Sequence, residues 1–151
     1  FELDVLCRMG KLTEVLDKIR SYWGGMLDLG AVTFWEEYDP SVPKEEQYDM
    51  YGDHFGKSLC HAWAASPIYF LAKYFAGLDL VNKDGVTYIL KPQMQYFTEL
   101  DCTLPVGSNG VMRLVWDGEI LEITPNADGG ILELGEQKLS LVRGETRRVK
   151  I

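Results

Sequence analysis

Apolar residues recur every three or four positions near the start of the chain, with charged residues placed between them. This stripe consists of Leu12, Val15, Leu16, Ile19 and Trp23. The spacing predicts an amphipathic helix that ends at Gly24-Gly25, because glycine often adopts the left-handed geometry of a helix C-terminus. A shorter helix over about Leu3–Met9, broken at Gly10, is predicted to precede it and to form an antiparallel hairpin with it.

The helical periodicity disappears between Gly24 and Gly56, where Gly, Pro, Asp and Tyr accumulate. Connections beyond roughly 12–15 residues are uncommon in compact domains and are often functional. We therefore expect the functional site in this segment.

A second helical pattern begins after Ser58, which is predicted to cap the helix, and ends at Gly77. The pattern is apolar on almost every side of the helix. The residues that bury these apolar sides are therefore expected to come in part from missing chain or from another subunit. Pro67 is predicted to bend it.

Beyond Gly77 the pattern changes to an alternation with a period of two, which is typical of strands. The predicted strands are Val86–Leu90, Phe97–Leu104, Val111–Trp116, Ile120–Thr124, Gly130–Leu134 and Lys138–Val142. Asp117-Gly118 and Gly135-Glu136 are predicted hairpin turns. The expected fold is therefore α+β, with a helical domain over residues 1–80 followed by an antiparallel β-sandwich over residues 81–151.

Composition and charge narrow the class of protein. Hydrophobic residues make up 46% and charged residues 25% of the 151 positions, which is ordinary for a globular chain. The net charge of −8 disfavours binding to nucleic acid or to anionic lipid. The most apolar run, Ala62–Ala72, is too short to span a bilayer, which takes roughly 20 residues. Neither nucleic acid nor membrane is expected as a partner, and the cellular compartment is left open.

No cofactor or metal is expected. Cys7, Cys60 and Cys102 are too widely spaced for a structural zinc site and are expected to be buried free thiols. Asp49 and Asp53 lack the spacing of a calcium loop.

Two short segments carry candidate chemistry. Phe34 and Trp35 are followed directly by Glu36 and Glu37. An aromatic face can cover the apolar side of a sugar ring, and a carboxylate can bind hydroxyls or activate water. His61 could also bind ligand hydroxyls. The alternatives are an exposed glutamate beside a buried tryptophan and a histidine with a purely structural role.

Several motifs together resemble one family. They are Trp23-Gly24-Gly25-Met26, Gly30-Ala31-Val32-Thr33-Phe34-Trp35-Glu36, Ser58-Leu59-Cys60-His61-Ala62-Trp63-Ala64-Ala65-Ser66-Pro67 and Lys91-Pro92-Gln93. In order and spacing they resemble the end of the catalytic region of bacterial α-L-rhamnosidases and the start of that family's C-terminal β-sandwich. The resemblance implies the last hairpins of a six-hairpin helical (α/α) barrel. The chain begins at Phe1 without an initiator methionine, so it is expected to be a piece of a longer protein.

The resemblance also implies roles for individual residues. Glu36 matches the general base of an inverting glycosidase, whose general acid would lie on missing upstream chain. His61 matches a position that contacts bound rhamnose, and Phe34, Trp35 and Trp63 would line the pocket. The implied partners are a rhamnose-containing glycoside or polysaccharide and the missing upstream part of the protein. The fragment alone is expected to be inactive.

Two departures from the family pattern leave the exact substrate open. Val32 stands where threonine is usual, and Cys60-His61-Ala62-Trp63 belongs to one branch's version of the helix start. The competing hypothesis is a non-catalytic carbohydrate-binding or structural module.

Overall fold

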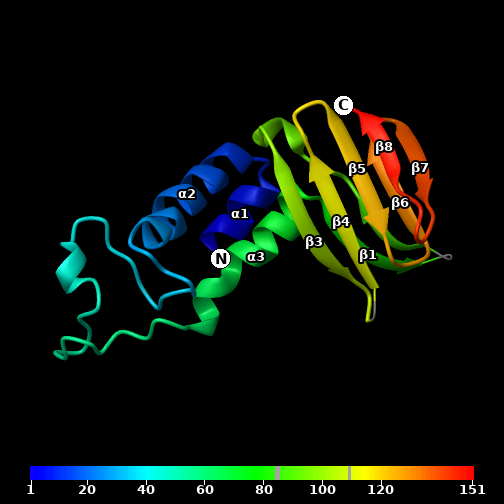
Figure 1. Cartoon of the computed structure of the whole chain (residues 1–151). Helices are drawn as coiled ribbons and strands as arrows, with labels where there is room; N and C mark the ends of the chain where they lie inside the picture. Colours follow the sequence, from blue (N-terminus) through cyan, green and yellow to red (C-terminus); the bar gives the residue numbers. More distant parts are fainter. Residues whose placement is uncertain (84–85, 109) are drawn as a thin grey trace. The chain divides into compact units, whose positions relative to one another are not determined.

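The structure is a computed structural model that describes residues 1–83, 86–108 and 110–151. The chain divides into two compact units, Phe1–Phe70 and Leu71–Ile151. Helices and a long loop make up the first unit, and two β-sheets dominate the second (Figure 1). The predicted α+β class and the order of helices before strands are therefore confirmed.

The two predicted N-terminal helices are present as α1 (Glu2–Arg8) and α2 (Leu12–Asp28). Gly10 separates them and has a positive φ of 74°. The two helices contact each other, and an ion pair between Lys18 and Glu2 (2.7 Å) joins their surfaces. The apolar stripe of α2 is buried on one face, as its spacing predicts.

The predicted end of α2 at Gly24-Gly25 is wrong, because the helix continues to Asp28. The ring of Tyr38 lies so close to Gly25 that a Cβ there would come within 2.4 Å of it. Tyr22 holds Tyr38 in place, because the backbone N–H of Tyr38 donates to the Tyr22 hydroxyl at 3.0 Å. Gly25 is therefore required for close packing and does not stop the helix.

This packing predicts opposite effects of alanine at the two adjacent glycines. A Cβ at Gly24 would have no described atom within 4 Å. Gly24→Ala should therefore raise the free energy of unfolding by about 0.5–1 kcal/mol, because alanine loses less backbone entropy in a helix. Gly25→Ala should lower it by roughly 1–3 kcal/mol, because its methyl group overlaps the Tyr38 ring. Denaturant unfolding measures both values, and a stabilised Gly25→Ala protein would contradict the close contact.

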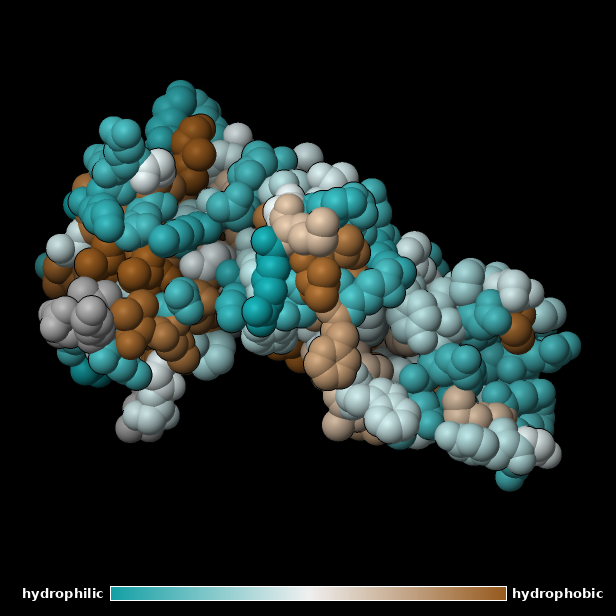
Figure 2. Space-filling model, turned by 180° about the vertical axis from the view of Figure 1, so that it is seen from behind, coloured by the Kyte–Doolittle hydropathy of each residue, from teal (hydrophilic) through white to brown (hydrophobic). Residues whose placement is uncertain are grey.

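A long irregular segment follows α2, as predicted, and includes the short 3₁₀ helix η1 (Lys44–Glu46). Gln47 is buried in this segment, and its side-chain amide donates to the carbonyls of Asp39 (2.5 Å) and Val42 (2.9 Å). The segment is the cyan-to-green trace at the left of Figure 1, and its surface, at the right of Figure 2, is mainly hydrophilic or intermediate in hydropathy. Polar bonds from a buried side chain to the backbone therefore help to order this segment.

The next helical segment consists of three short pieces with different hydrogen-bond patterns. They are the 3₁₀ helix η2 (Ala62–Ala65), the α-helix α3 (Ser66–Phe70) and the π-helix η3 (Leu71–Phe75). The predicted helix cap at Ser58 is wrong, because the backbone of Ser58 pairs with Glu36 instead. The predicted end near Gly77 is confirmed.

Apolar side chains remain exposed along this helical segment, as its all-round apolar pattern suggested. Trp63 is 69% exposed, Ile68 61% and Tyr69 46%. Pro67 lies at the second residue of α3, directly after the 3₁₀ helix η2. The bend expected there stays a prediction.

The second unit contains eight described strands and the 3₁₀ helix η4 (Met94–Tyr96). The strands are β1 (Leu78–Lys83), β2 (Val86–Leu90), β3 (Leu100–Val106), β4 (Gly110–Trp116), β5 (Ile120–Pro125), β6 (Gly130–Leu134), β7 (Gln137–Leu141) and β8 (Arg147–Lys150). All six predicted strands are present, Val86–Leu90 and Gly130–Leu134 with the predicted bounds and the other four with shifted ends. Strands β1 and β8 were not predicted.

The strands form two four-stranded sheets, in the orders β1-β2-β6-β7 and β3-β4-β5-β8. The second sheet is antiparallel throughout, but β2 and β6 run parallel, so the expectation of a purely antiparallel arrangement is wrong for this pair. Three strands of the other sheet separate β2 from β6 in sequence, which leaves ample chain for the crossover that parallel pairing needs. At this pair the ring of Tyr88 lies against Gly130, where a Cβ would be 2.3 Å from it.

The predicted hairpin turns are local features and are confirmed. Gly135-Glu136 connects the paired residues Leu134 and Gln137 of β6 and β7. Between β4 and β5, the Asp117 carboxylate accepts the backbone N–H groups of Glu119 (2.9 Å) and Ile120 (2.7 Å). These hydrogen bonds lower the pKa of Asp117, the bond from Ile120 having the larger effect.

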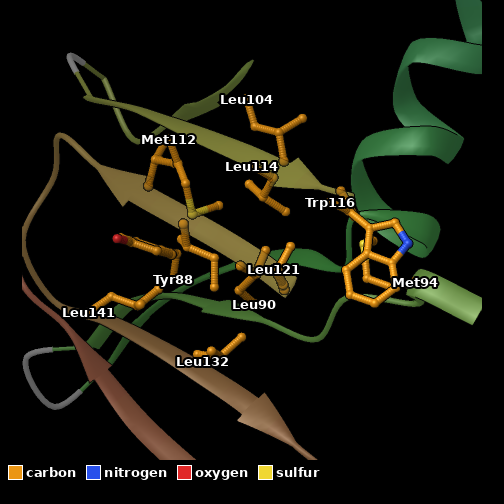
Figure 3. Packing of buried hydrophobic residues seen from close by; sticks show 13 residues of the cluster. Tyr88, Leu90, Met94, Leu104, Met112, Leu114, Trp116, Leu121, Leu132 and Leu141 are labelled. Carbon is orange, nitrogen blue, oxygen red and sulfur yellow. The ribbon is translucent and has the colours of Figure 1, made fainter. Parts of the chain in front are cut away.

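The two sheets share one hydrophobic core, which supports a sandwich. Figure 3 shows side chains from both sheets converging, among them Leu90 and Leu132 from the first and Leu114 and Leu121 from the second. All four side chains are fully buried. Burial of each such leucine stabilises the fold by roughly 1.5–3 kcal/mol, which makes this core the main source of stability in the second unit.

No helix within the described residues is long and apolar enough to cross a membrane. The cysteines are free thiols, but only Cys7 is buried. Cys102 is half-buried and Cys60 is exposed, so the expectation of buried thiols is wrong for Cys60. Cys60 lies two residues before the helical segment, which begins at Ala62.

Candidate functional site

Glu36 lies where two distant parts of the first unit run side by side. Its backbone N–H donates to the carbonyl of Ser58 (2.9 Å), and the N–H of Ser58 donates back to Glu36 Oε2 (3.2 Å). Nearby, the N–H of His61 donates to the carbonyl of Phe34 (2.8 Å). The Thr33 hydroxyl donates to the carbonyl of Leu59. These bonds bring the two segments that carried the candidate chemistry together.

The Glu36 carboxylate has a hydrogen-bond donor on each oxygen. Tyr51 donates its hydroxyl to Oε1 (3.1 Å), and Ser58 donates its N–H to Oε2. His61 Nδ1 lies 3.5 Å from Oε2. The Glu36 side chain is only 9% exposed, and the His61 side chain 27%. Glu36 is therefore a held and largely buried carboxylate, unlike its exposed neighbour Glu37.

The side chains that contact the Glu36 carboxylate do not include a lysine or arginine among the described residues. Within the described ranges, no lysine or arginine forms an ion pair with Glu36. A carboxylate held by neutral donors and by a histidine can accept a proton from water or bind a hydroxyl.

The aromatic residues predicted to line the site occupy different environments. Trp35 is 4% exposed and packs in a small core with Met26 and Ala31. Phe34 is half-buried. Trp63, in contrast, is exposed, and its ring lies 4.1 Å from the ring of His61, centroid to centroid. His61 thus contacts both Glu36 and Trp63. The indole of Trp35, in contrast, is buried in the small core.

Tyr51 belongs to the site and was not predicted from the sequence. It reaches Glu36 from a tight turn in which Met50 and Asp53 exchange two backbone hydrogen bonds, each 3.0 Å long. The sequence signal for this turn was Gly52-Asp53, which marks a turn but does not identify which side chain it presents.

Among residues 1–83, 86–108 and 110–151, no group of three or more His, Cys, Asp or Glu side chains is placed to hold a metal ion.

A cavity of about 330 Å³ lies elsewhere in the first unit. It is lined by Glu2, Leu3, Lys18, Ser21, Tyr22, Trp23 and Pro40. None of these is one of the predicted site residues, so this cavity is separate from the Glu36 site.

Comparisons with known proteins do not identify a family. A scan against protein-family models finds no match, and no curated protein matches the chain significantly.

Proposed function

We propose that the chain is the C-terminal part of an inverting α-L-rhamnosidase-like glycoside hydrolase, with Glu36 as the general base. One observation carries the proposal: the Glu36 carboxylate is nearly buried, is held by Tyr51 and Ser58, and faces His61 at 3.5 Å. The motifs around Glu36 and His61 were the ones that resembled the rhamnosidase family. Their convergence on one carboxylate supports a shared site.

The proposed reaction divides the work between this chain and the rest of the protein. Glu36 takes a proton from a water molecule as that water attacks the anomeric carbon, and the bond from this carbon to the leaving oxygen breaks. A carboxylic acid from polypeptide outside this sequence protonates the leaving oxygen. Inverting enzymes separate the two carboxyl groups by about 6.5–9.5 Å to leave room for the water. In this scheme His61 and Trp63 contact the sugar beside the base, and the helices complete a helical barrel.

Assay of the full-length protein tests the proposal. With an aryl α-L-rhamnoside as substrate we expect release of rhamnose, and proton NMR early in the reaction should show the β-anomer first, because inversion converts an α-glycoside into a β-sugar. Initial release of the α-anomer would contradict an inverting mechanism. Absence of hydrolysis by a protein shown to be folded by circular dichroism would contradict the enzymatic function.

A non-catalytic carbohydrate-binding module is the second candidate, and the exposed indole of Trp63 favours it. An exposed aromatic ring beside a histidine offers a platform for the apolar face of a sugar. If this candidate is correct, the full-length protein should bind rhamnosides in calorimetry without hydrolysing them, and Trp63→Ala should reduce the affinity at least tenfold, which corresponds to the roughly 1.4 kcal/mol of a modest stacking contact.

A further inference from the structure

Tyr51 has an unusual backbone conformation. Its φ is 57°, in the left-handed region, and Gly52 follows with a φ of 81°. Two consecutive positive φ values between Met50 and Asp53 match a type I′ turn, in which Asn-Gly is the favoured pair. Tyrosine is a poor choice for the first position, since its Cβ disfavours this conformation. Such outliers persist where the surroundings enforce them, and they cluster at functional sites.

The surroundings of the turn do enforce this conformation. Beside the two Met50–Asp53 hydrogen bonds, a side-chain hydrogen bond joins His54 Nδ1 to the Asp49 carboxylate at 2.5 Å. The backbone at Gly56 passes so close to the turn that a Cβ would be 2.2 Å from the Met50 carbonyl oxygen. The turn is therefore fixed on both flanks, independently of the tyrosine side chain.

Burial of the Tyr51 ring does not explain why a tyrosine occupies this position. Tyr51 is 84% exposed, so its ring contributes little to a core. Its hydroxyl instead donates to Oε1 of Glu36 at 3.1 Å. This hydrogen bond to the carboxylate raises the pKa of Tyr51 above its ordinary value. A tyrosine hydroxyl is protonated at neutral pH even without such a shift, so it is a hydrogen-bond donor there.

We propose, on the basis of the function proposed above, that Tyr51 is a positioning residue for the general base, with the Met50–Asp53 turn delivering its hydroxyl to Glu36. The hydroxyl fixes Oε1 while the Ser58 N–H fixes Oε2, so the carboxylate has one orientation toward the attacking water. Orientation of this kind matters for rate, because a misplacement of 1 Å costs about 10²-fold.

Kinetics of two hydroxyl deletions in the full-length protein test the proposal. Tyr51→Phe should lower kcat for an aryl α-L-rhamnoside about tenfold while KM changes less than about twofold, because the lost contact orients the base and does not bind substrate. The matched control is Tyr48→Phe in the same segment. The Tyr48 ring lies 5.6 Å from that of Trp35, and its hydroxyl has no hydrogen bond to any residue that the structure describes. Its kcat should stay within about twofold of wild type.

A spectroscopic titration tests the contact without substrate. Glu36→Gln removes the charge that raises the pKa of Tyr51, so one tyrosine should ionise at lower pH in the absorbance of the phenolate. The same substitution in a Tyr51→Phe background should leave the titration unchanged. A shift that persists in that background would overturn the assignment.

The outcomes separate this inference from the proposed function. An active wild-type protein whose Tyr51→Phe variant retains full kcat overturns the positioning role alone. A folded wild-type protein that hydrolyses no rhamnoside overturns both, even if the titration shows the Tyr51–Glu36 contact. Loss of kcat in Tyr51→Phe but not in Tyr48→Phe, with an inactive Glu36→Gln protein, supports both.

Discussion

Glu36→Gln in the full-length protein should reduce hydrolysis of an aryl α-L-rhamnoside by about 10²–10⁴-fold, the usual contribution of general base catalysis. The amide has the shape of the carboxylate and its oxygen still accepts a hydrogen bond, but it cannot take the proton of the attacking water. Because the Glu36 side chain lies in a network of neutral donors, its loss of charge should leave the fold intact. The measurements are kcat/KM and the circular dichroism spectrum of the same preparation.

Glu37→Gln is the matched control for this substitution. Glu37 is the adjacent residue with the same side chain, but it is exposed, whereas the Glu36 side chain is only 9% exposed. We expect Glu37→Gln to change kcat/KM by less than about threefold, because surface charges act weakly through solvent. Equal losses in the two variants, or retention of more than about a hundredth of the rate by Glu36→Gln, would contradict the assignment of the base.

The sequence located part of the candidate site because its residues fall in two short motifs. Glu36 and His61 were each singled out by their neighbours, and the structure places the His61 ring 3.5 Å from the Glu36 carboxylate. Their contact depends on backbone pairing between residues far apart in the chain, which no local pattern encodes. The contribution of Tyr51 was missed for a related reason, since it depends on a positive φ in a turn where composition indicates only that the chain reverses.

The fold shows the same division between local and long-range information. The β6–β7 hairpin was predictable because Gly135-Glu136 specifies a two-residue turn between alternating patterns. The parallel pairing of β2 with β6 was not predictable. It joins strands that are separated in sequence by three strands of the other sheet, and no local pattern indicates such a pairing. Strand β8 was missed because its only apolar residue is Val149; it is a short edge strand in which Arg148 and Lys150 pair with Glu122 and Glu119.

Gly25 shows how the same residue type can mislead. A glycine pair at the end of an apolar stripe is a common sign of a helix terminus. Here the missing side chain makes room for Tyr38, a residue 13 positions later, and the helix continues. A glycine is thus needed at this position, but the sequence does not show why. Only the contact with Tyr38 shows that the reason is close packing and not a helix end.

Gly77→Ala should be among the most destabilising single substitutions in the second unit. Gly77 connects η3 to β1 with a φ of 75°, and a Cβ there would come within 1.9 Å of the carbonyl oxygen of Lys91. This neighbour is backbone, and the N–H of Lys91 donates to the Gly77 carbonyl at 2.9 Å, so neither chain can move without losing that bond. Backbone strain and steric overlap therefore combine, and we expect the free energy of unfolding to fall by roughly 3–5 kcal/mol.

Gly144→Ala separates the two contributions. Gly144 has a similar φ of 78°, but a Cβ there would meet no described atom within 4 Å. The substitution should therefore cost only the conformational strain, about 1–2 kcal/mol. Urea unfolding followed by tryptophan fluorescence measures both values, and the gap between them isolates the overlap with Lys91. If the two variants lost equal stability, the close approach of Gly77 to Lys91 would be wrong, and the helix would pass into β1 with space for a side chain.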